Sequence, residues 1–262
     1  LKGEKSVVTY MTDKSGNVVE TLATYEGEAG KDLVTTLDIE LQQEAERIVE
    51  DALWKMKSSR DGSLLDRAFV VMMNPNTGEI LSMVGKKVEY DAEGKMYLAD
   101  YSYGTFTTAY EIGSTVKGAT LLTGYREGAV TIGESQIDEP IILGQNLTKS
   151  SIFNRSGRIR MDDLMALEQS SNVYMFKIAM SMGGLSYYPY IGIASLLRDD
   201  TLQRLRNGYA QVGLGVPTGI DLPGETAGVI GVPDSPGKVL DITIGQFDTY
   251  TPMQLAQYVS TI

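Results

Sequence analysis

The 262-residue chain contains no histidine and no cysteine. The lack of histidine excludes a Ser-His-Asp triad and any histidine metal site. The lack of cysteine excludes a thiol nucleophile, a disulfide framework and thiolate zinc. A hydrolase or an acyltransferase with this composition must therefore use a lysine or a carboxylate as its base. The sequence gives no reason to assign a metal or a cofactor.

Basic residues and long apolar runs are also scarce. The chain has 23 Lys and Arg against 34 Asp and Glu, a net charge of −11. We therefore expect no nucleic-acid partner, because such a surface needs a basic stripe. No apolar run approaches the roughly 20 residues that span a bilayer, and no signal peptide opens the chain. Since it begins at Leu1 without a methionine, we expect it to be part of something longer.

The remaining residues predict a mixture of strands and helices. Alternation favours a hairpin over residues 6–22, and the run 33–37 reads as a further strand. Asp38 is the expected N-cap of a helix over 39–56. A second hairpin is predicted over 67–84, followed by a polar surface excursion from Lys86 to Asp100. Further expectations are an extended segment at 140–143, helices over 161–168, 173–182 and from 252 onward, and loops throughout the Gly- and Pro-rich residues 208–231.

A helix predicted over residues 113–125 dominates the sequence. Its only charge is Lys117, and an ammonium buried without a partner costs several kcal/mol or gives up its proton. Ser114, three residues earlier, lies on the same helical face. A serine with a lysine one turn later is a nucleophile beside its own base. The positive end of the helix dipole lies close to the serine oxygen.

A structural interpretation of the same residues stays open at this point. Ser114 could be a plain N-cap that follows Gly113. Lys117 could run its stem along the helix and place its charge in water. Under this interpretation the Ser-x-x-Lys spacing has no chemical meaning.

A short polar cluster, Gln169 to Asn172, separates two apolar helices. Serine and asparagine favour a helix break, because their side chains compete for backbone hydrogen bonds. The break is expected to place Ser170 and Asn172 on one side, facing a cleft. The order Ser114-x-x-Lys117 and then Ser170-x-Asn172 matches two of the three signature elements of penicillin-recognising acyl-serine transferases.

With these motifs, the chain resembles the transpeptidase domain of class B (monofunctional) penicillin-binding proteins. The resemblance covers roughly residues 31–262 and is most like the elongation-associated type of Gram-positive cocci, notably over residues 103–110 and 245–248. The matching segments are residues 35–42, 74–81, 110–117, 170–172, 218–225, 245–247 and 251–256.

The resemblance implies an α/β fold of the α+β type, the penicillin-binding/β-lactamase-like transpeptidase fold, with an antiparallel sheet flanked by helices and a helical subdomain. Residues 1–30 would be the tail of an N-terminal pedestal or linker region, and residues 31–262 the transpeptidase domain. The family's third element, a Lys-Thr/Ser-Gly strand, is not found after the Ser-x-Asn motif, and the triplet Lys14-Ser15-Gly16 lies in the turn expected within the first hairpin. We therefore expect a domain truncated before that strand, with C-terminal sheet strands missing and the hairpin at 69–84 left unpaired.

The resemblance also implies a role for each motif residue. Ser114 would attack the penultimate D-alanyl carbonyl of a stem peptide, and neutral Lys117 would take the serine proton. Ser170 would relay a proton to the leaving amine, and Asn172 would hold the substrate amide and Lys117. A second strand's amine would then deacylate the enzyme, whereas a β-lactam would acylate Ser114 and leave slowly. The missing strand would supply one oxyanion donor, a loss that typically costs about 10²–10³ in rate.

Three functions stay in competition. The first is a serine D,D-transpeptidase that cross-links peptidoglycan stem peptides and is inhibited by β-lactam antibiotics. The second is a catalytically incomplete fragment that acts only as a binding or structural module, and the third is a serine β-lactamase. The resemblance further implies a wall-synthesis glycosyltransferase as a possible partner. It also implies a position on the extracytoplasmic face of the cell membrane, with an anchor upstream of Leu1.

Overall fold

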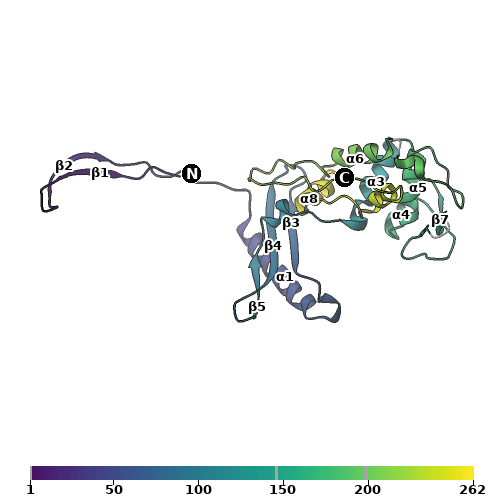
Figure 1. The fold of residues 1–262 in the computed structure, drawn as a ribbon, viewed down its shortest axis with the longest axis horizontal. Coiled ribbons are helices and arrows are strands. Elements are labelled where there is room, and N and C mark those ends of the chain that lie inside the picture. Colours follow the sequence, from purple (N-terminus) through teal and green to yellow (C-terminus); the bar gives the residue numbers. More distant parts are fainter. Residues whose placement is uncertain (1, 145–146, 198–199) are drawn as a thin grey trace. The chain divides into compact units, whose positions relative to one another are not determined.

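The computed structural model describes residues 2–144, 147–197 and 200–262. Its contacts divide the chain into two units, Leu1–Thr36 and Leu37–Ile262. The first unit contains an antiparallel hairpin of β1 (Val7–Thr12) and β2 (Val18–Tyr25), as predicted (Figure 1). All residues of both strands are exposed. A hairpin of this kind is marginally stable alone in water, and its described residues bury no core.

The second unit joins a small sheet to a helical region (Figure 1). No helix in the described part of the chain has the length and apolar character required to cross a membrane. The elements of the sheet region are α1 (Ile39–Lys57), η1 (Arg60–Gly62), β3 (Arg67–Met73), β4 (Ile80–Tyr90), β5 (Met96–Asp100), α2 (Gly104–Thr107) and α8 (Pro252–Thr261). Those of the helical region are η2 (Gly113–Val116), α3 (Lys117–Arg126), β6 (Gln136–Asp138), β7 (Ile141–Gly144), β8 (Leu147–Lys149), β9 (Ile159–Met161), α4 (Asp163–Glu168), α5 (Asn172–Met182), η3 (Ala194–Leu197), α6 (Thr201–Gln211), α7 (Gly237–Asp241) and η4 (Ile242–Ile244).

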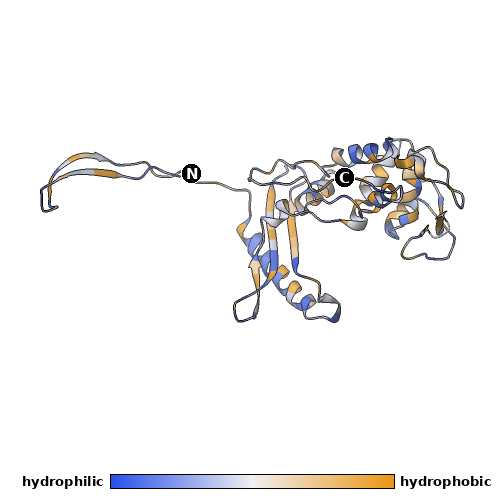
Figure 2. Cartoon of the chain, viewed as in Figure 1, coloured by the Kyte–Doolittle hydropathy of each residue, from blue (hydrophilic) through white to orange (hydrophobic). Residues whose placement is uncertain are grey.

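The sheet is antiparallel, in the order β3-β4-β5, and helices pack against it. Helix α1 begins where predicted, because the Asp38 side chain accepts hydrogen bonds from the N–H groups of Glu40 and Leu41 at 3.0 Å each. Alternate residues of β3 face α1, where Val70 packs against a cluster formed by Ala45, Val49 and Val84. The other alternate residues line an open groove of about 560 Å³ beside α8. Figure 2 shows apolar residues along β3 and β4.

Two predictions near the sheet are wrong. Residues 33–37 do not form a strand. The polar stretch from Lys86 to Asp100 is not a surface excursion, because it contains the end of β4 and all of β5. Lys86 is 7% exposed and pairs with Glu46 and Glu50 of α1 at 3.0 and 2.9 Å. The hairpin at 69–84 therefore has a third strand, and it is not the isolated pair expected from the sequence.

The main core lies in the helical region, where α3, α5, α6, α7 and η4 meet. The central α5 buries Val173 to Ala179 except Lys177, which explains its nearly continuous apolar sequence. The prediction of loops throughout 208–231 is wrong at its start, because Gly208 lies inside α6. A Cβ at Gly208 would lie 2.1 Å from the Thr123 hydroxyl oxygen. This glycine therefore permits close packing of α6 on α3.

Candidate active site

A contact between two glycines positions the turn that carries Ser114. Gly113 has φ 56° and donates its N–H to the Gly245 carbonyl at 2.9 Å. Gly245 has φ 72°, and a Cβ there would lie 2.2 Å from the Gly113 carbonyl oxygen. Both positive φ values and the backbone-to-backbone approach require glycine. The segment around Gly245 thus anchors the residue before the candidate nucleophile.

Ser114 and Lys117 lie on the first turn of the predicted helix. That turn is the 3-10 helix η2, and the α-helix proper, α3, starts at Lys117. The Lys117 N–H donates to the Ser114 carbonyl, and side chains three residues apart are eclipsed in this geometry. Ser114 is exposed, and its hydroxyl makes no hydrogen bond within the described residues. The turn therefore presents a free hydroxyl on the same face as Lys117.

The Lys117 side chain is buried and fully hydrogen-bonded. It is 2% exposed. Its Nζ donates to the Ser170 carbonyl at 2.7 Å, to the Ser170 hydroxyl at 2.8 Å and to the Asn172 side-chain oxygen at 2.7 Å. These three contacts use all three donors of an ammonium group. The structure thus brings together Lys117, Ser170 and Asn172, as the sequence predicts for the two motifs.

Backbone strain at the helix break directs Ser170 toward Lys117. Ser170 has φ 54°, one of two positive values at non-glycine residues in the described chain. The conformation costs about 1–2 kcal/mol, and such strain concentrates at functional sites. Here it turns both the carbonyl and the hydroxyl of one residue toward the same Nζ atom. The next residue, Ser171, is the N-cap of α5 and accepts from the Tyr174 N–H at 3.0 Å.

The electrostatics of the site favour a lysine that can lose its proton. Burial lowers the pKa of the Lys117 ammonium to about 8, and the nearby carboxylate of Asp138 opposes that shift. An appreciable fraction of Lys117 is therefore neutral at mildly alkaline pH, which a general base requires. Neither structural alternative from the sequence is realised. The Lys117 charge does not reach water, and Ser114 caps neither η2 nor α3.

A buried polar network lies behind the helix break, and the sequence analysis missed it. The Asp138 carboxylate is 1% exposed and accepts hydrogen bonds from the hydroxyls of Ser151 and Ser171. The Ser151 hydroxyl oxygen also accepts a hydrogen bond from the Asn172 N–H at 2.9 Å. No spacing in the sequence singles out Asp138 among the acidic residues. Only the pairing of β6 with β9 and the fold of the 150s segment bring it to the motif.

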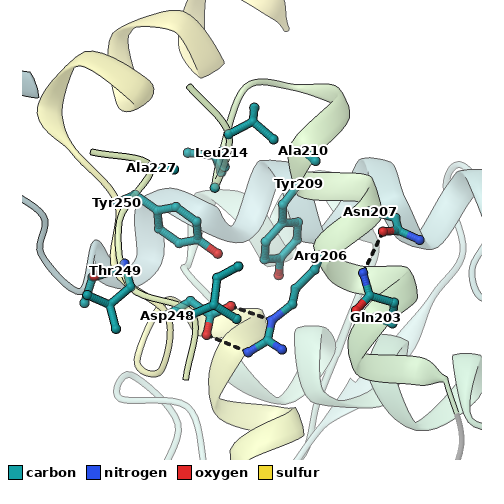
Figure 3. A pocket seen from close by; sticks show the side chains of 14 residues that line it. Gln203, Arg206, Asn207, Tyr209, Ala210, Leu214, Ala227, Asp248, Thr249 and Tyr250 are labelled. Carbon is teal, nitrogen blue, oxygen red and sulfur yellow. Dashed lines mark hydrogen bonds and ion pairs between the residues drawn. The ribbon is translucent and has the colours of Figure 1, made fainter. Parts of the chain in front are cut away.

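A separate cavity of about 260 Å³ lies beside α6 (Figure 3). Arg206 forms a two-pronged ion pair with Asp248 at its edge, with both contacts at 2.8 Å. The hydroxyl of Tyr209 lies 2.6 Å from that of Thr120 on α3. None of the four motif residues lines this cavity, so it is not part of the candidate site.

The family follows from comparison with known proteins. The family model described as "Penicillin binding protein transpeptidase domain" matches residues 68–262. The chain belongs to this family, as a transpeptidase domain of the class B type. The predicted family fold is confirmed, with its antiparallel sheet, flanking helices and helical region. Similarity to the elongation-associated type of Gram-positive cocci stays a prediction.

Individual relatives match all or nearly all of the chain. It is 45% identical to "Penicillin-binding protein 2A" of Bacillus subtilis over 262 residues, which are 100% of this chain and 36% of the relative. A solved structure of penicillin-binding protein 2B from Streptococcus pneumoniae strain R6 matches with a TM-score of 0.84 and 32% identity, over 100% of this chain and 42% of that one. "Peptidoglycan D,D-transpeptidase MrdA" of Haemophilus influenzae is 25% identical, over 98% of this chain and 38% of the relative. The chain thus spans less than half the length of these relatives.

Proposed function

We propose that this chain carries the acyl-enzyme site of a serine D,D-transpeptidase that cross-links peptidoglycan stem peptides. One observation carries the proposal: buried Lys117 donates to Ser170 and Asn172 and lies three residues after an exposed, unpaired Ser114. The printed name of the Haemophilus influenzae relative supplies the reaction class. The proposal assigns a catalytic role to Ser114, Lys117, Ser170 and Asn172.

The first half-reaction acylates Ser114. Its Oγ attacks the carbonyl carbon of the penultimate D-alanine while its proton passes to neutral Lys117, which acts as the general base. The bond from that carbon to the terminal nitrogen then breaks. The nitrogen takes a proton and leaves as D-alanine, and the acyl group stays on Ser114. The N–H of Ser114 is one of the two donors that the family uses for the oxyanion.

The contacts of Lys117 explain why Ser170 is suited to relay the proton. Neutral lysine has two N–H donors and one lone pair, so it can donate to two of its three partners while the lone pair stays free for the Ser114 proton. The Ser170 carbonyl and the Asn172 side-chain oxygen can only accept. Among the three, only the Ser170 hydroxyl can accept a proton from the Lys117 ammonium and donate its own proton onward. A proton taken by Lys117 can therefore move through Ser170 to the leaving amine without displacement of the other two contacts.

The second half-reaction transfers the acyl group. The amine of a second stem peptide attacks the Ser114 ester carbon, the ester bond breaks, and the amine proton returns through Lys117 to the Ser114 oxygen. The product is a peptide cross-link and a free serine. A β-lactam would acylate the same oxygen, but its ring nitrogen stays tethered, so the ester persists. The chain's Lys-Ser-Gly triplet, Lys14-Ser15-Gly16, lies in the turn between β1 and β2, and no Lys-Thr/Ser-Gly strand follows the Ser170 motif. A second oxyanion donor is therefore not assigned.

The remaining features of the proposal concern the whole protein. Residues 31–262 would form the transpeptidase domain, and residues 1–30 the tail of a pedestal or linker. The protein would act at the extracytoplasmic face of the membrane, held by an upstream anchor, with a wall-synthesis glycosyltransferase as a partner. These assignments rest on the class B resemblance and on the share of the relatives that the chain spans.

A reaction with stem pentapeptides tests the function. The protein at its full natural length is mixed with a donor ending in D-alanyl-D-alanine and a second strand that offers an amine. Equal amounts of free D-alanine and cross-linked dimer are expected, and neither product is expected with Ser114→Ala. Binding without D-alanine release would favour the structural module. Rapid hydrolysis of benzylpenicillin, without dimer formation, would favour the β-lactamase.

A further inference from the structure

We propose that Asp138 is a positioning residue for the Lys117 site, with two effects. Its buried carboxylate fixes the backbone turn that presents the acceptors of Lys117, and it places a negative charge near the lysine ammonium. The inference deepens the proposed function and rests on it for its catalytic consequence. The burial and contacts of Asp138 stand independently of that function.

The Asp138 carboxylate accepts three side-chain hydrogen bonds. It lies at the end of β6, opposite Ile159 in the pairing of β6 with β9. One carboxylate oxygen accepts from the Ser151 hydroxyl at 2.5 Å and from the Ser171 hydroxyl. The other accepts from the Asn154 side-chain amide at 2.8 Å. An ionised carboxylate can be buried at this depth only with such compensation.

The two serine hydroxyls connect Asp138 to the start of α5. Ser151 accepts from the N–H groups of Asn172 and Val173 at 2.9 and 3.2 Å, and Ser171 accepts from that of Tyr174 at 3.0 Å. These are the first three N–H groups of the helix, which have no partner within it. One carboxylate thus orients both hydroxyls that satisfy them. Its negative charge also faces the positive end of the helix dipole.

The same turn holds the acceptors of Lys117. Ser170 precedes the N-cap and Asn172 is the first residue of α5, so their oxygens move with the backbone that the serines fix. The strained φ of Ser170 needs a rigid surrounding to persist. Loss of the Asp138 carboxylate frees both serine hydroxyls to rotate. The geometric effect therefore reaches Lys117 through Ser170 and Asn172.

Other charged groups lie near Asp138, and their effects must be distinguished from the effect of Asp138 on Lys117. Burial lowers the pKa of Lys117 on α3, and the charge of the Asp138 carboxylate opposes that shift by favouring the charged form of the lysine. Burial lowers the pKa of Lys177 on α5, while the charges of Glu139 and Asp138 oppose that shift. Its Nζ donates to the Ile137 carbonyl at 2.6 Å. Glu139 pairs with exposed Arg158 at 2.8 Å. Among the described acidic groups, Asp138 is therefore the one that acts on Lys117.

Asp138→Asn, made in the protein at its full natural length, tests both effects, with Glu139→Gln as the matched control. The protonation of Lys117 is followed by carbamylation with cyanate, which reacts with neutral amines. Peptide mass spectrometry reads the modification at each pH, normalised to exposed lysines of the same digest. The rate of acylation by benzylpenicillin is measured over the same pH range. Folding of each variant is checked by circular dichroism.

Removal of the carboxylate should lower the midpoint of Lys117 carbamylation by about one pH unit, the size expected when an opposite charge is lost. The acidic limb of the pH profile of the acylation rate should move toward lower pH by the same amount. The plateau rate should fall at least about tenfold. Glu139→Gln should change neither. An unchanged midpoint in Asp138→Asn would overturn the inference, because a residue needed only for folding lowers the plateau without moving the limb.

The experiment also distinguishes failure of the proposed function, and misfolding of a variant, from failure of the inference about Asp138. If the parent protein is not acylated at all, the proposed function fails, while the cyanate midpoints still decide the role of Asp138. If Asp138→Asn does not fold, Ser151→Ala is used instead. It removes the hydroxyl that links Asp138 to the Asn172 N–H and keeps the Asp138 charge. The plateau should then fall while the midpoint holds. Parental acylation by Ser151→Ala would overturn the inference.

Discussion

The Nζ atom of Lys117 lies 2.8 Å from the hydroxyl oxygen of Ser170, although 53 residues separate them in the chain. The contact joins the N-terminus of α3 to the break before α5. It forms because Ser170 adopts a left-handed conformation and because Asn172 starts the next helix one residue after the N-cap. Two motifs that are each common in proteins thereby become one site with a buried, titratable amine.

The acylation rate should rise with pH. Burial lowers the pKa of Lys117 to about 8, and only the neutral amine can accept the Ser114 proton. The rate constant for benzylpenicillin should therefore be low at pH 6 and approach a plateau above pH 9, with a midpoint near that pKa. Stopped mixtures analysed by mass spectrometry give the profile. A flat profile across this range would exclude neutral Lys117 as the base.

The Ser170 hydroxyl should matter for chemistry, and its backbone conformation should matter for stability. Ser170→Ala and Ser170→Gly both remove the hydroxyl, and both should lower acylation by about 10²-fold or more. Glycine adopts φ 54° without strain, so Ser170→Gly should be more stable than Ser170→Ala by about 1 kcal/mol. Thermal unfolding of the pair tests the difference. Equal stabilities would argue against a strained left-handed Ser170.

The contact between Gly113 and Gly245 should be intolerant of any side chain. Gly245→Ala places a Cβ 2.2 Å from a backbone oxygen and strains φ as well. We expect a loss of more than about 2 kcal/mol and displacement of the serine turn, since the neighbour cannot rotate away. Gly78→Ala is the matched control, with φ 78° and open space around its Cβ. Its loss should be near 1 kcal/mol, measured by urea unfolding, with acylation intact.

The buried ion pair of Figure 3 should be important for folding. Asp248 is 3% exposed and Arg206 17%. Arg206→Met leaves the carboxylate buried with only the Gly231 N–H as a described donor, a change that typically costs about 3–5 kcal/mol. Arg47→Met breaks exposed pairs on α1 and should not measurably change the unfolding midpoint. Comparable losses in the two variants would contradict this account.

Local signals in the sequence were sufficient for the motifs and for most helices. Asp38, the Ser-x-x-Lys spacing and the polar break before Asn172 all act within a few residues, and the structure follows them. Long-range packing explains the errors. Lys86 occupies a buried strand position because two carboxylates of α1 neutralise it. Gly208 stays helical because α3 packs closely against it.

The Asp138 network depends entirely on such long-range packing. Its members come from β6, from the 150s segment and from the start of α5, and each is an ordinary residue type in its own neighbourhood. A buried carboxylate can be recognised only when its burial and its donors are known together. Sequence alone can therefore indicate the candidate nucleophile, the candidate base and their partners, but not the residue that we propose to orient them.

The most direct test of the central claim is the intact mass of the protein after incubation with benzylpenicillin, beside Ser114→Ala. The account predicts one stable penicilloyl adduct on the parent, located on the peptide that contains Ser114, and none on the variant. An adduct of equal yield on Ser114→Ala would contradict the assignment of Ser114 as the nucleophile. No adduct on the parent at its full natural length would contradict the acyl-enzyme mechanism itself.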